Sequence, residues 1–172
     1  MIRNTLYIFL MLIISTACST GQNKTAENVN SSDNESVNFG DAQENGIIGK
    51  WINSTIDVDL ETYNNSDTSF HVAINEDNWE IKMNIKPVET FLREDGTFQN
   101  NYLDTLGNIF HSNSGIWYLD GDSLFLEDEN DEIYSFRVIV KGDVMEMHTV
   151  VDYDDDGKKD DQYFGTYKKI KD

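Results

Sequence analysis

The chain has one cysteine, Cys18, among its 172 residues, so it cannot form an intramolecular disulfide. Proline is equally rare, with one residue, while aromatic side chains make up 12% of the sequence. Proline is disfavoured in β-sheets and aromatic residues are favoured there, so this composition is typical of a β-rich domain. Stability has to come from a hydrophobic core, or from a bound metal, rather than from covalent cross-links.

Positive charge is also scarce. Thirteen Lys and Arg residues stand against 32 Asp and Glu residues, which gives a formal net charge of −19. Proteins that bind nucleic acids or anionic lipid surfaces by charge carry a cationic surface, so the composition argues against both kinds of partner. It favours divalent cations wherever several carboxylates converge.

Long hydrophobic runs are absent except at the N-terminus. The segment MIRNTLYIFLMLIISTAC carries Arg3 and then an apolar run over residues 6–14. That run is too short for a permanent membrane span. Together with the small residues that follow it, the run predicts a secretory signal peptide over residues 1–17.

Cys18 directly follows the small residues Ser15, Thr16 and Ala17. This arrangement resembles the lipobox of bacterial lipoproteins, although Ser15 stands where the usual pattern has an aliphatic residue. The resemblance implies that Cys18 is lipidated and anchors the protein in the bacterial cell envelope, at the outer membrane. Ordinary secretion is the alternative, because Ser15 and Ala17 also suit a small-x-small cleavage site. Whether the protein faces the periplasm or the cell surface stays open.

Residues 18–45 are dominated by Asn, Ser, Asp, Glu and Thr, with few apolar side chains. A segment of this composition cannot bury enough surface to fold on its own. As a flexible coil it would reach about 30 Å from its anchor. The sequence therefore predicts a disordered tether between Cys18 and a folded domain over residues 46–172.

The domain itself consists of short apolar or alternating segments broken by turn residues. The clearest is WEIKMNI, in which Trp79, Ile81, Met83 and Ile85 would share one face of a strand. Nine further segments have the same character: IIGKWINST, TSFHVAI, VETFLRE, GTFQNNYL, IFHSNSGIWYL, SLFLED, IYSFRVIV, VMEMHTVV and QYFGTYKKI. Their spacing of roughly ten residues is typical of an antiparallel meander. We predict an all-β domain of about eight to ten strands.

Tight turns are predicted between these strands at residues 94–96, 104–107, 120–122 and 141–143, each with a glycine. An open sheet of this length would leave exposed edges, so a sandwich or a closed barrel is expected. Residues 57–78 exceed a simple hairpin and predict an extra strand or a long mouth loop.

Four motifs in a fixed order decide between sandwich and barrel: IIGKW, EDGTF, SGIWYLDGDSLFLED and YFGTYKK. The series resembles the lipocalin-like domains of lipoproteins from Bacteroidetes-type bacteria. The resemblance implies an antiparallel, up-and-down, lipocalin-like β-barrel, with Trp51 packing across its closed end.

In a closed barrel, one apolar face of each strand lines the interior. The predicted interior residues are Trp51, Ile81, Met83, Ile85, Phe98, Leu124, Leu126, Phe136, Val138, Met145 and Met147. Such an interior is either filled by side chains or holds one small apolar or amphipathic ligand, and both alternatives stand.

The segment VDYDDDGKKDD, residues 151–161, is the only stretch with recognisable site chemistry. Its D-x-D-x-D-G portion resembles extracellular calcium loops, in which carboxylates from alternate residues meet as the backbone curls. The predicted calcium ligands are Asp152, Asp154, Asp156, Asp160, Asp161 and the carbonyl of Lys158. An EF-hand is excluded because Lys159 and Tyr163 replace its apolar and glutamate positions, and because both flanks are predicted strands. A solvated acidic turn, balanced by the two lysines, is the alternative.

No catalytic motif is recognisable in the sequence, and acidic residues are so abundant that no single pair of carboxylates indicates glycoside chemistry or argues against it. His71, His111 and His148 lie on separate predicted strands without zinc-site spacing, and neither a Gly-x-Ser-x-Gly elbow nor a phosphate-binding glycine loop occurs. We therefore expect a non-enzymatic envelope lipoprotein whose barrel binds a small apolar or amphipathic ligand. The alternative is an interaction or structural module, stabilised by calcium, that binds a protein or glycan partner through its outer surface or loops.

Overall fold

The computed structural model describes residues 46–63 and 66–171, so the predicted signal peptide, Cys18 and the whole predicted tether lie outside the described residues. The described chain forms nine strands and the short helix α2 (Trp79–Met83). The strands are β1 (Gly49–Leu60), β2 (Phe70–Ile74), β3 (Glu89–Leu92), β4 (Thr97–Leu103), β5 (Ile109–Asp120), β6 (Ser123–Asp128), β7 (Ile133–Lys141), β8 (Val144–Val151) and β9 (Asp161–Ile170). Within this part of the chain, no helix has the length and apolar character needed to cross a membrane.

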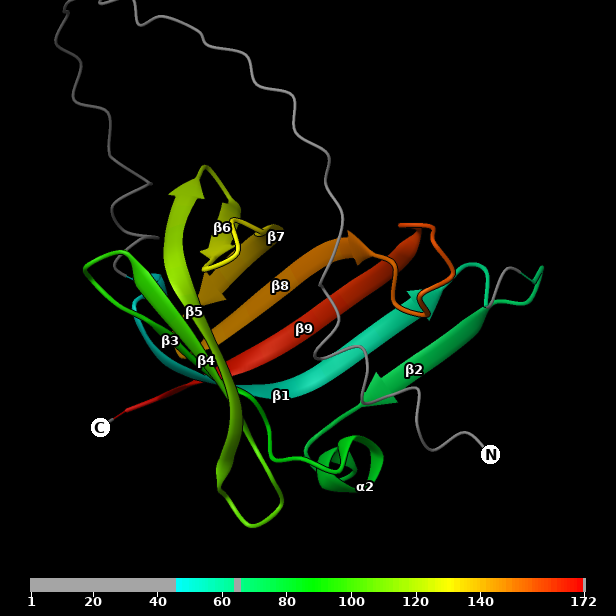
Figure 1. Cartoon of the computed structure of the whole chain (residues 1–172), viewed down its shortest axis with the longest axis horizontal. Coiled ribbons are helices and arrows are strands. Elements are labelled where there is room, and N and C mark those ends of the chain that lie inside the picture. Colours follow the sequence, from blue (N-terminus) through cyan, green and yellow to red (C-terminus); the bar gives the residue numbers. More distant parts are fainter. Residues whose placement is uncertain (1–45, 64–65, 172) are drawn as a thin grey trace, which may run out of the picture.

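Strands β1 and β3–β9 form a closed antiparallel barrel (Figure 1). From β3 to β9 each strand pairs with the next along the chain, and the sheet closes because β1 pairs with β9. β2 is an extra strand. It pairs with residues 56–60 of β1, whereas β3 pairs with residues 49–52. The predicted up-and-down barrel and the extra strand between residues 57 and 78 are both confirmed.

One end of the barrel is closed by the start of β1 and by the β3–β4, β5–β6 and β7–β8 turns. Trp51 is fully buried at this end, and its Nε1 donates a hydrogen bond to the Ile47 carbonyl at 2.6 Å. The ammonium of Lys169 lies 5.2 Å from the centroid of the Trp51 ring. All four turns predicted from glycine positions occur between consecutive strands.

An apolar cluster, which we call the closed-end cluster, fills this end. Its buried members are Ile47, Trp51, Leu92, Phe98, Trp117, Leu124, Leu126, Val138, Met145, Met147 and Tyr167. Seven of the predicted interior residues are among them, and Phe136 is half-buried against them. Alternation along the strands therefore places one side of each strand in the core.

The strand predicted for WEIKMNI is wrong. Residues 79–83 form α2, which ends at Asn84 in the left-handed conformation with φ 56°. Residues four apart share a helix face, so Trp79 and Met83 are buried together, while Ile81 points away and is 85% exposed. Ile81 therefore does not line the barrel.

Met83 and Ile85 are buried, but in a second cluster at the other end of the barrel, which we call the far-end cluster. Its buried members are Ile56, Val58, Leu60, Ile74, Trp79, Met83, Ile85 and Val88. A register shift between Asn53 and Thr55 keeps both halves of β1 facing inward. The far end is thus covered by α2 and β2, which lie beside the C-terminal half of β1 (Figure 1).

Candidate functional site

The predicted calcium segment connects β8 to β9 through residues 152–160. This β8–β9 loop lies at the far end of the barrel, near the end of β1 (Figure 1). Tyr153 extends from the loop and packs against the far-end cluster. The loop is therefore joined to the barrel core by one of its own side chains.

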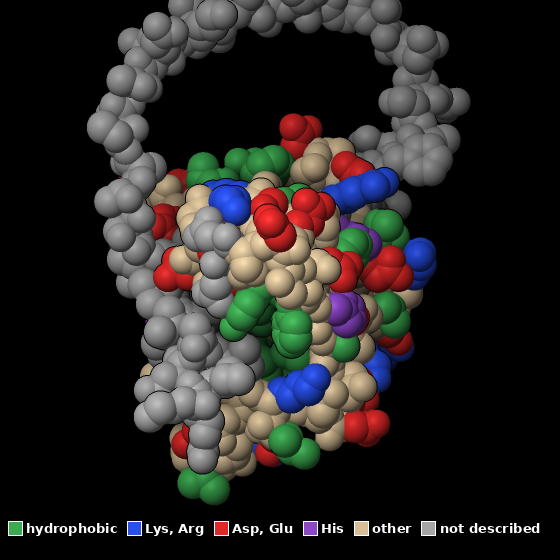
Figure 2. Space-filling model, turned by 90° about the vertical axis from the view of Figure 1, so that its right-hand side faces the viewer, with side chains coloured by type: hydrophobic (Ala, Val, Ile, Leu, Met, Phe, Trp, Pro, Cys, Tyr) green, Lys and Arg blue, Asp and Glu red, His purple; other side chains and the backbone are tan. Residues whose placement is uncertain are grey.

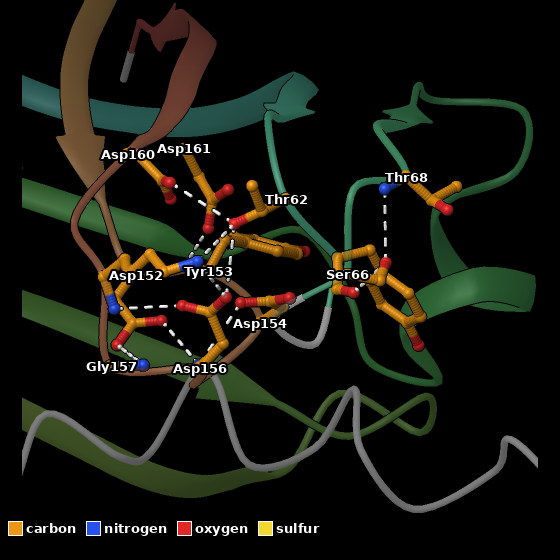
Figure 3. A network of polar contacts seen from close by, with 12 residues as sticks. Thr62, Ser66, Thr68, Asp152, Tyr153, Asp154, Asp156, Gly157, Asp160 and Asp161 are labelled. Atoms are coloured by element: carbon orange, nitrogen blue, oxygen red, sulfur yellow. Dashed lines mark hydrogen bonds and ion pairs between the residues drawn. The ribbon is translucent and has the colours of Figure 1, made fainter.

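Three carboxylates converge in this loop. Asp152, Asp154 and Asp161 each offer an oxygen atom, and these atoms all lie within 4.8 Å of one another (Figure 3). The backbone curls around Asp152, whose Oδ1 accepts from the Asp156 N–H at 3.0 Å and whose Oδ2 accepts from the Gly157 N–H at 2.9 Å. Asp161, the first residue of β9, faces back into the loop and accepts from the Tyr153 N–H at 2.6 Å.

Asp161 differs from an ordinary surface carboxylate. It is fully buried, and its Oδ1 has no hydrogen-bond partner. Burial raises the pKa of the Asp161 carboxyl, the nearby Asp154 and Asp160 carboxylates raise it further, and the Tyr153 N–H acts in the opposite direction. A carboxylate removed from water needs a proton or a positive partner. Either a proton or a cation next to Asp161 would meet this need.

The side chains of the other predicted ligands gather around Thr62, although the Asp156 N–H still donates to Asp152 and Asp154. The Thr62 hydroxyl lies 3.3 Å from an oxygen of Asp156 and 3.3 Å from an oxygen of Asp160. Lys158 joins through its side chain, with Nζ 3.2 Å from Thr62 Oγ1 and 3.7 Å from Asp156 Oδ2. The structure therefore brings Lys158 to the site through its ammonium group. Thr62 is 94 residues from Asp156, and no sequence pattern connects the two.

A second polar group lies inside the barrel, between the two apolar clusters. The Tyr163 and Tyr167 hydroxyl oxygens lie 3.3 Å apart, and both pKa values are raised, chiefly by burial. Burial, with a smaller effect of Tyr167, raises the pKa of Tyr102 to about 12. All three hydroxyls therefore stay protonated at neutral pH and are able to donate hydrogen bonds.

Amide side chains accompany these tyrosines. The pairing of β3, β4 and β5 places Asn113 opposite Asn100 and Asn100 opposite Thr90, which is buried. Thr90 donates to the Asn100 Oδ1 at 2.7 Å, whereas Asn113 Oδ1 is buried without a partner. Asn53 is buried beside the Tyr167 hydroxyl, and its amide side chain acts to lower the Tyr167 pKa, against the larger effect of burial. We call Asn53, Tyr102, Asn113, Tyr163 and Tyr167 the polar belt.

No protein-family model matches the chain, and no curated protein matches it. Among solved structures, it is similar to a lipocalin-like protein from Bacteroides uniformis ATCC 8492, with 13% sequence identity and a TM-score of 0.44. The alignment covers 73% of this chain and 99% of that protein.

The three histidines lie in different surroundings. His71 contacts Asp59 through Nδ1 at 2.7 Å on an exposed face of the β1–β2 pair. The His111 ring lies 5.2 Å from Tyr102, and the His148 ring meets Phe164 edge-on at 4.7 Å. Each histidine is thus held by a different neighbour.

Proposed function

We propose that the protein is a lipocalin-like binding module that takes one small amphipathic ligand into its barrel. The polar belt is the observation that carries the proposal. A barrel interior that serves only as a core favours apolar side chains, because each buried polar group without a partner costs about 1–3 kcal/mol. Here Asn113 Oδ1 carries that cost, and a ligand would relieve it.

The belt also restricts the chemistry of the ligand. Asn113 Oδ1 accepts hydrogen bonds, whereas Asn53 Nδ2 and the tyrosine hydroxyls donate them. A hydroxyl, carboxylic acid or amide group meets both needs, since each donates and accepts. The closed-end and far-end clusters lie on either side of the polar belt, and their apolar side chains suit the aliphatic part of a ligand. The ligand class we infer is therefore a small aliphatic compound with one such head group.

Access is expected at the far end, where a ligand has to pass α2 and β2, the elements that cover it. Figure 2 shows the face of the molecule that lies on the right of Figure 1, with hydrophobic side chains gathered near its middle. Tyr63, in the connection after β1, and Phe70, at the start of β2, are 41% and 56% exposed, with ring centroids 5.8 Å apart. Exposed apolar side chains of this kind commonly border a binding site.

Titration of the full chain with the fluorescent fatty acid cis-parinaric acid tests the proposal. We expect saturable enhancement of its fluorescence, reversed by decanol and not by decane, because only the alcohol meets the polar belt. Tyr167→Phe or Asn113→Leu should weaken binding about threefold to tenfold, the worth of one hydrogen bond. Tyr118→Phe makes the same chemical change as Tyr167→Phe at a 43% exposed position, and binding should not change. Equal effects of the two Tyr→Phe changes, or no enhancement, would refute the proposal.

A second candidate is an interaction module that contacts a protein or glycan through its loops. Three exposed side chains around the β4–β5 turn favour it: Leu106 at 86%, Ile109 at 56% and Phe110 at 46%. This candidate predicts that Leu106→Asp lowers co-sedimentation of the protein with isolated bacterial envelopes. Thr105→Asp, on the same turn, is the matched control. Equal co-sedimentation of both variants and the unaltered chain would exclude this turn as the contact.

We also propose that lipidated Cys18 holds the protein at the outer membrane of the envelope. Support comes from the position of the cysteine after a short apolar run and three small residues. Cys18→Ala should abolish incorporation of a labelled fatty acid and release the protein from the membrane fraction. An unlabelled cysteine in the unaltered chain would point to ordinary secretion.

A further inference from the structure

We propose that the β8–β9 loop binds one calcium ion through Asp152, Asp154 and Asp161, and that the ion fastens the loop to the far end of the barrel. This site is separate from the polar belt, and its occupancy does not require a ligand in the barrel. It stands on the geometry of the three carboxylates and on the burial of Asp161.

The spacing of the oxygen atoms suits a calcium ion. Calcium–oxygen distances are about 2.3–2.6 Å, so two oxygens on opposite sides of one ion lie at most about 5 Å apart. The oxygens of Asp152, Asp154 and Asp161 fall within 4.8 Å of one another. One ion can therefore contact all three with little movement of the loop.

Asp161 supplies an independent observation. It is fully buried, and its Oδ1 lacks a hydrogen-bond partner. An exposed acidic turn leaves its carboxylates to water, whereas water cannot compensate the charge of Asp161. Lys158 lies on the Thr62 side of the loop, against Asp156. A cation that balances Asp161 would thus lie next to Asp152 and Asp154.

Ligand chemistry favours calcium over other cations. All three groups are carboxylates, which suit hard cations, whereas zinc prefers nitrogen and sulfur ligands. An irregular loop with water completing six to eight oxygens suits calcium, because magnesium requires a near-ideal octahedron.

Tyr153 connects the site to the barrel. It stands between Asp152 and Asp154, donates its backbone N–H to Asp161, and packs its ring against the far-end cluster. An ion that orders these three carboxylates also orders the Tyr153 backbone. Calcium is therefore expected to stabilise the far end of the fold.

Calorimetric titration of the chelator-treated full chain with calcium chloride tests this inference, together with thermal melting. We expect one site with a Kd of about 10⁻⁴–10⁻³ M, the range of extracellular modules. Millimolar calcium should raise the Tm by about 5 °C. Asp161→Asn and Asp154→Asn should each weaken binding about tenfold or more, because each removes a charged ligand.

Asp155→Asn is the matched control, since it removes the same charge from the same loop. Asp155 is exposed and outside the converging group, and asparagine tolerates its φ of 60°. The calcium affinity of the Asp155→Asn variant should stay within about twofold of that of the unaltered chain. Asp161→Asn keeps an oxygen for the Tyr153 N–H, so melting without calcium will show that this variant folds. Absence of binding, an equal loss in Asp155→Asn, or an equal Tm increase with magnesium would overturn the proposal.

Discussion

The hydroxyl oxygens of Tyr163 and Tyr167 lie 3.3 Å apart on the inner face of β9, with Gly165 between the two residues. Both rings occupy the space that a side chain at position 165 would take. A Cβ atom there would lie 2.6 Å from Tyr163 Oη, and 3.0 Å from ring carbons of both tyrosines. The polar belt thus depends on the absence of a side chain at Gly165.

Gly165→Ala should therefore destabilise the barrel. The added methyl group meets two buried rings that have little room to move, and overpacking of this kind costs about 1–3 kcal/mol. Urea unfolding followed by tryptophan fluorescence measures the loss. Gly46→Ala is the control, because its Cβ would meet only Val140 at an ordinary 3.6 Å. Equal stability of the two variants would show that the tyrosine rings adjust freely.

Alkaline pH should weaken the fold through the buried tyrosines. Tyr102 has its pKa raised from 10.0 to about 12 by burial, so its contribution to stability is complete below pH 10. The contribution is lost progressively as the pH rises from 10 to about 12, because only the unfolded chain ionises freely in that window. Urea unfolding across this window should be less pH-dependent in Tyr102→Phe. Unchanged pH dependence would mean that Tyr102 titrates normally.

Two buried tryptophans should respond differently to the same substitution. Trp51 Nε1 donates to the Ile47 carbonyl at 2.6 Å, so Trp51→Phe leaves that carbonyl without its partner and should cost about 1–3 kcal/mol beyond the loss of ring area. Trp79 Nε1 is buried without a partner. Trp79→Phe removes this unsatisfied donor and should be milder. Chemical denaturation compares the pair, and a milder Trp51→Phe would contradict the assigned hydrogen bond.

The α2 segment offers a test of helix against strand. Ile81→Lys should change the free energy of unfolding by no more than about 0.5 kcal/mol, because Ile81 is 85% exposed. Met83→Ala should cost about 2–5 kcal/mol, since Met83 is buried in the far-end cluster. A strand with both side chains on one buried face would make the two variants similarly harmful. Thermal melting of each variant distinguishes these outcomes.

The individual strands could be predicted because alternation and turns are local patterns, whereas the choice of a barrel over a sandwich came from the resemblance to lipocalin-like domains. Alternation and glycine turns identify β3 through β9 one at a time, and up-and-down pairing follows from short connections. Sequence reasoning failed at WEIKMNI because Trp79 and Met83 suit both a strand face and a helix face. Whether residues 79–83 form a strand or a helix depends on the apolar surface at the far end of the barrel, which α2 covers. That surface is formed by residues distant in the chain, so the local pattern could not reveal it.

The two candidate sites also differ in how much of each could be predicted from the sequence. The acidic loop is contiguous, so its carboxylates were predictable, although their grouping was not. Asp161 joins Asp152 and Asp154, while Asp156 and Asp160 turn towards Thr62. The polar belt draws its members from β1, β4, β5 and β9, and it becomes visible only when the strand register is known.

The pairing of β1 with β9 has a consequence for how the protein is made. These strands stand at opposite ends of the folded domain, and they form the seam that closes the barrel. Contacts between such distant segments require closure of a long loop, which slows folding to the millisecond-to-second range. During synthesis the early strands remain without a closing partner until the last strand has emerged. The time before closure is therefore when chaperones have most opportunity to bind this chain.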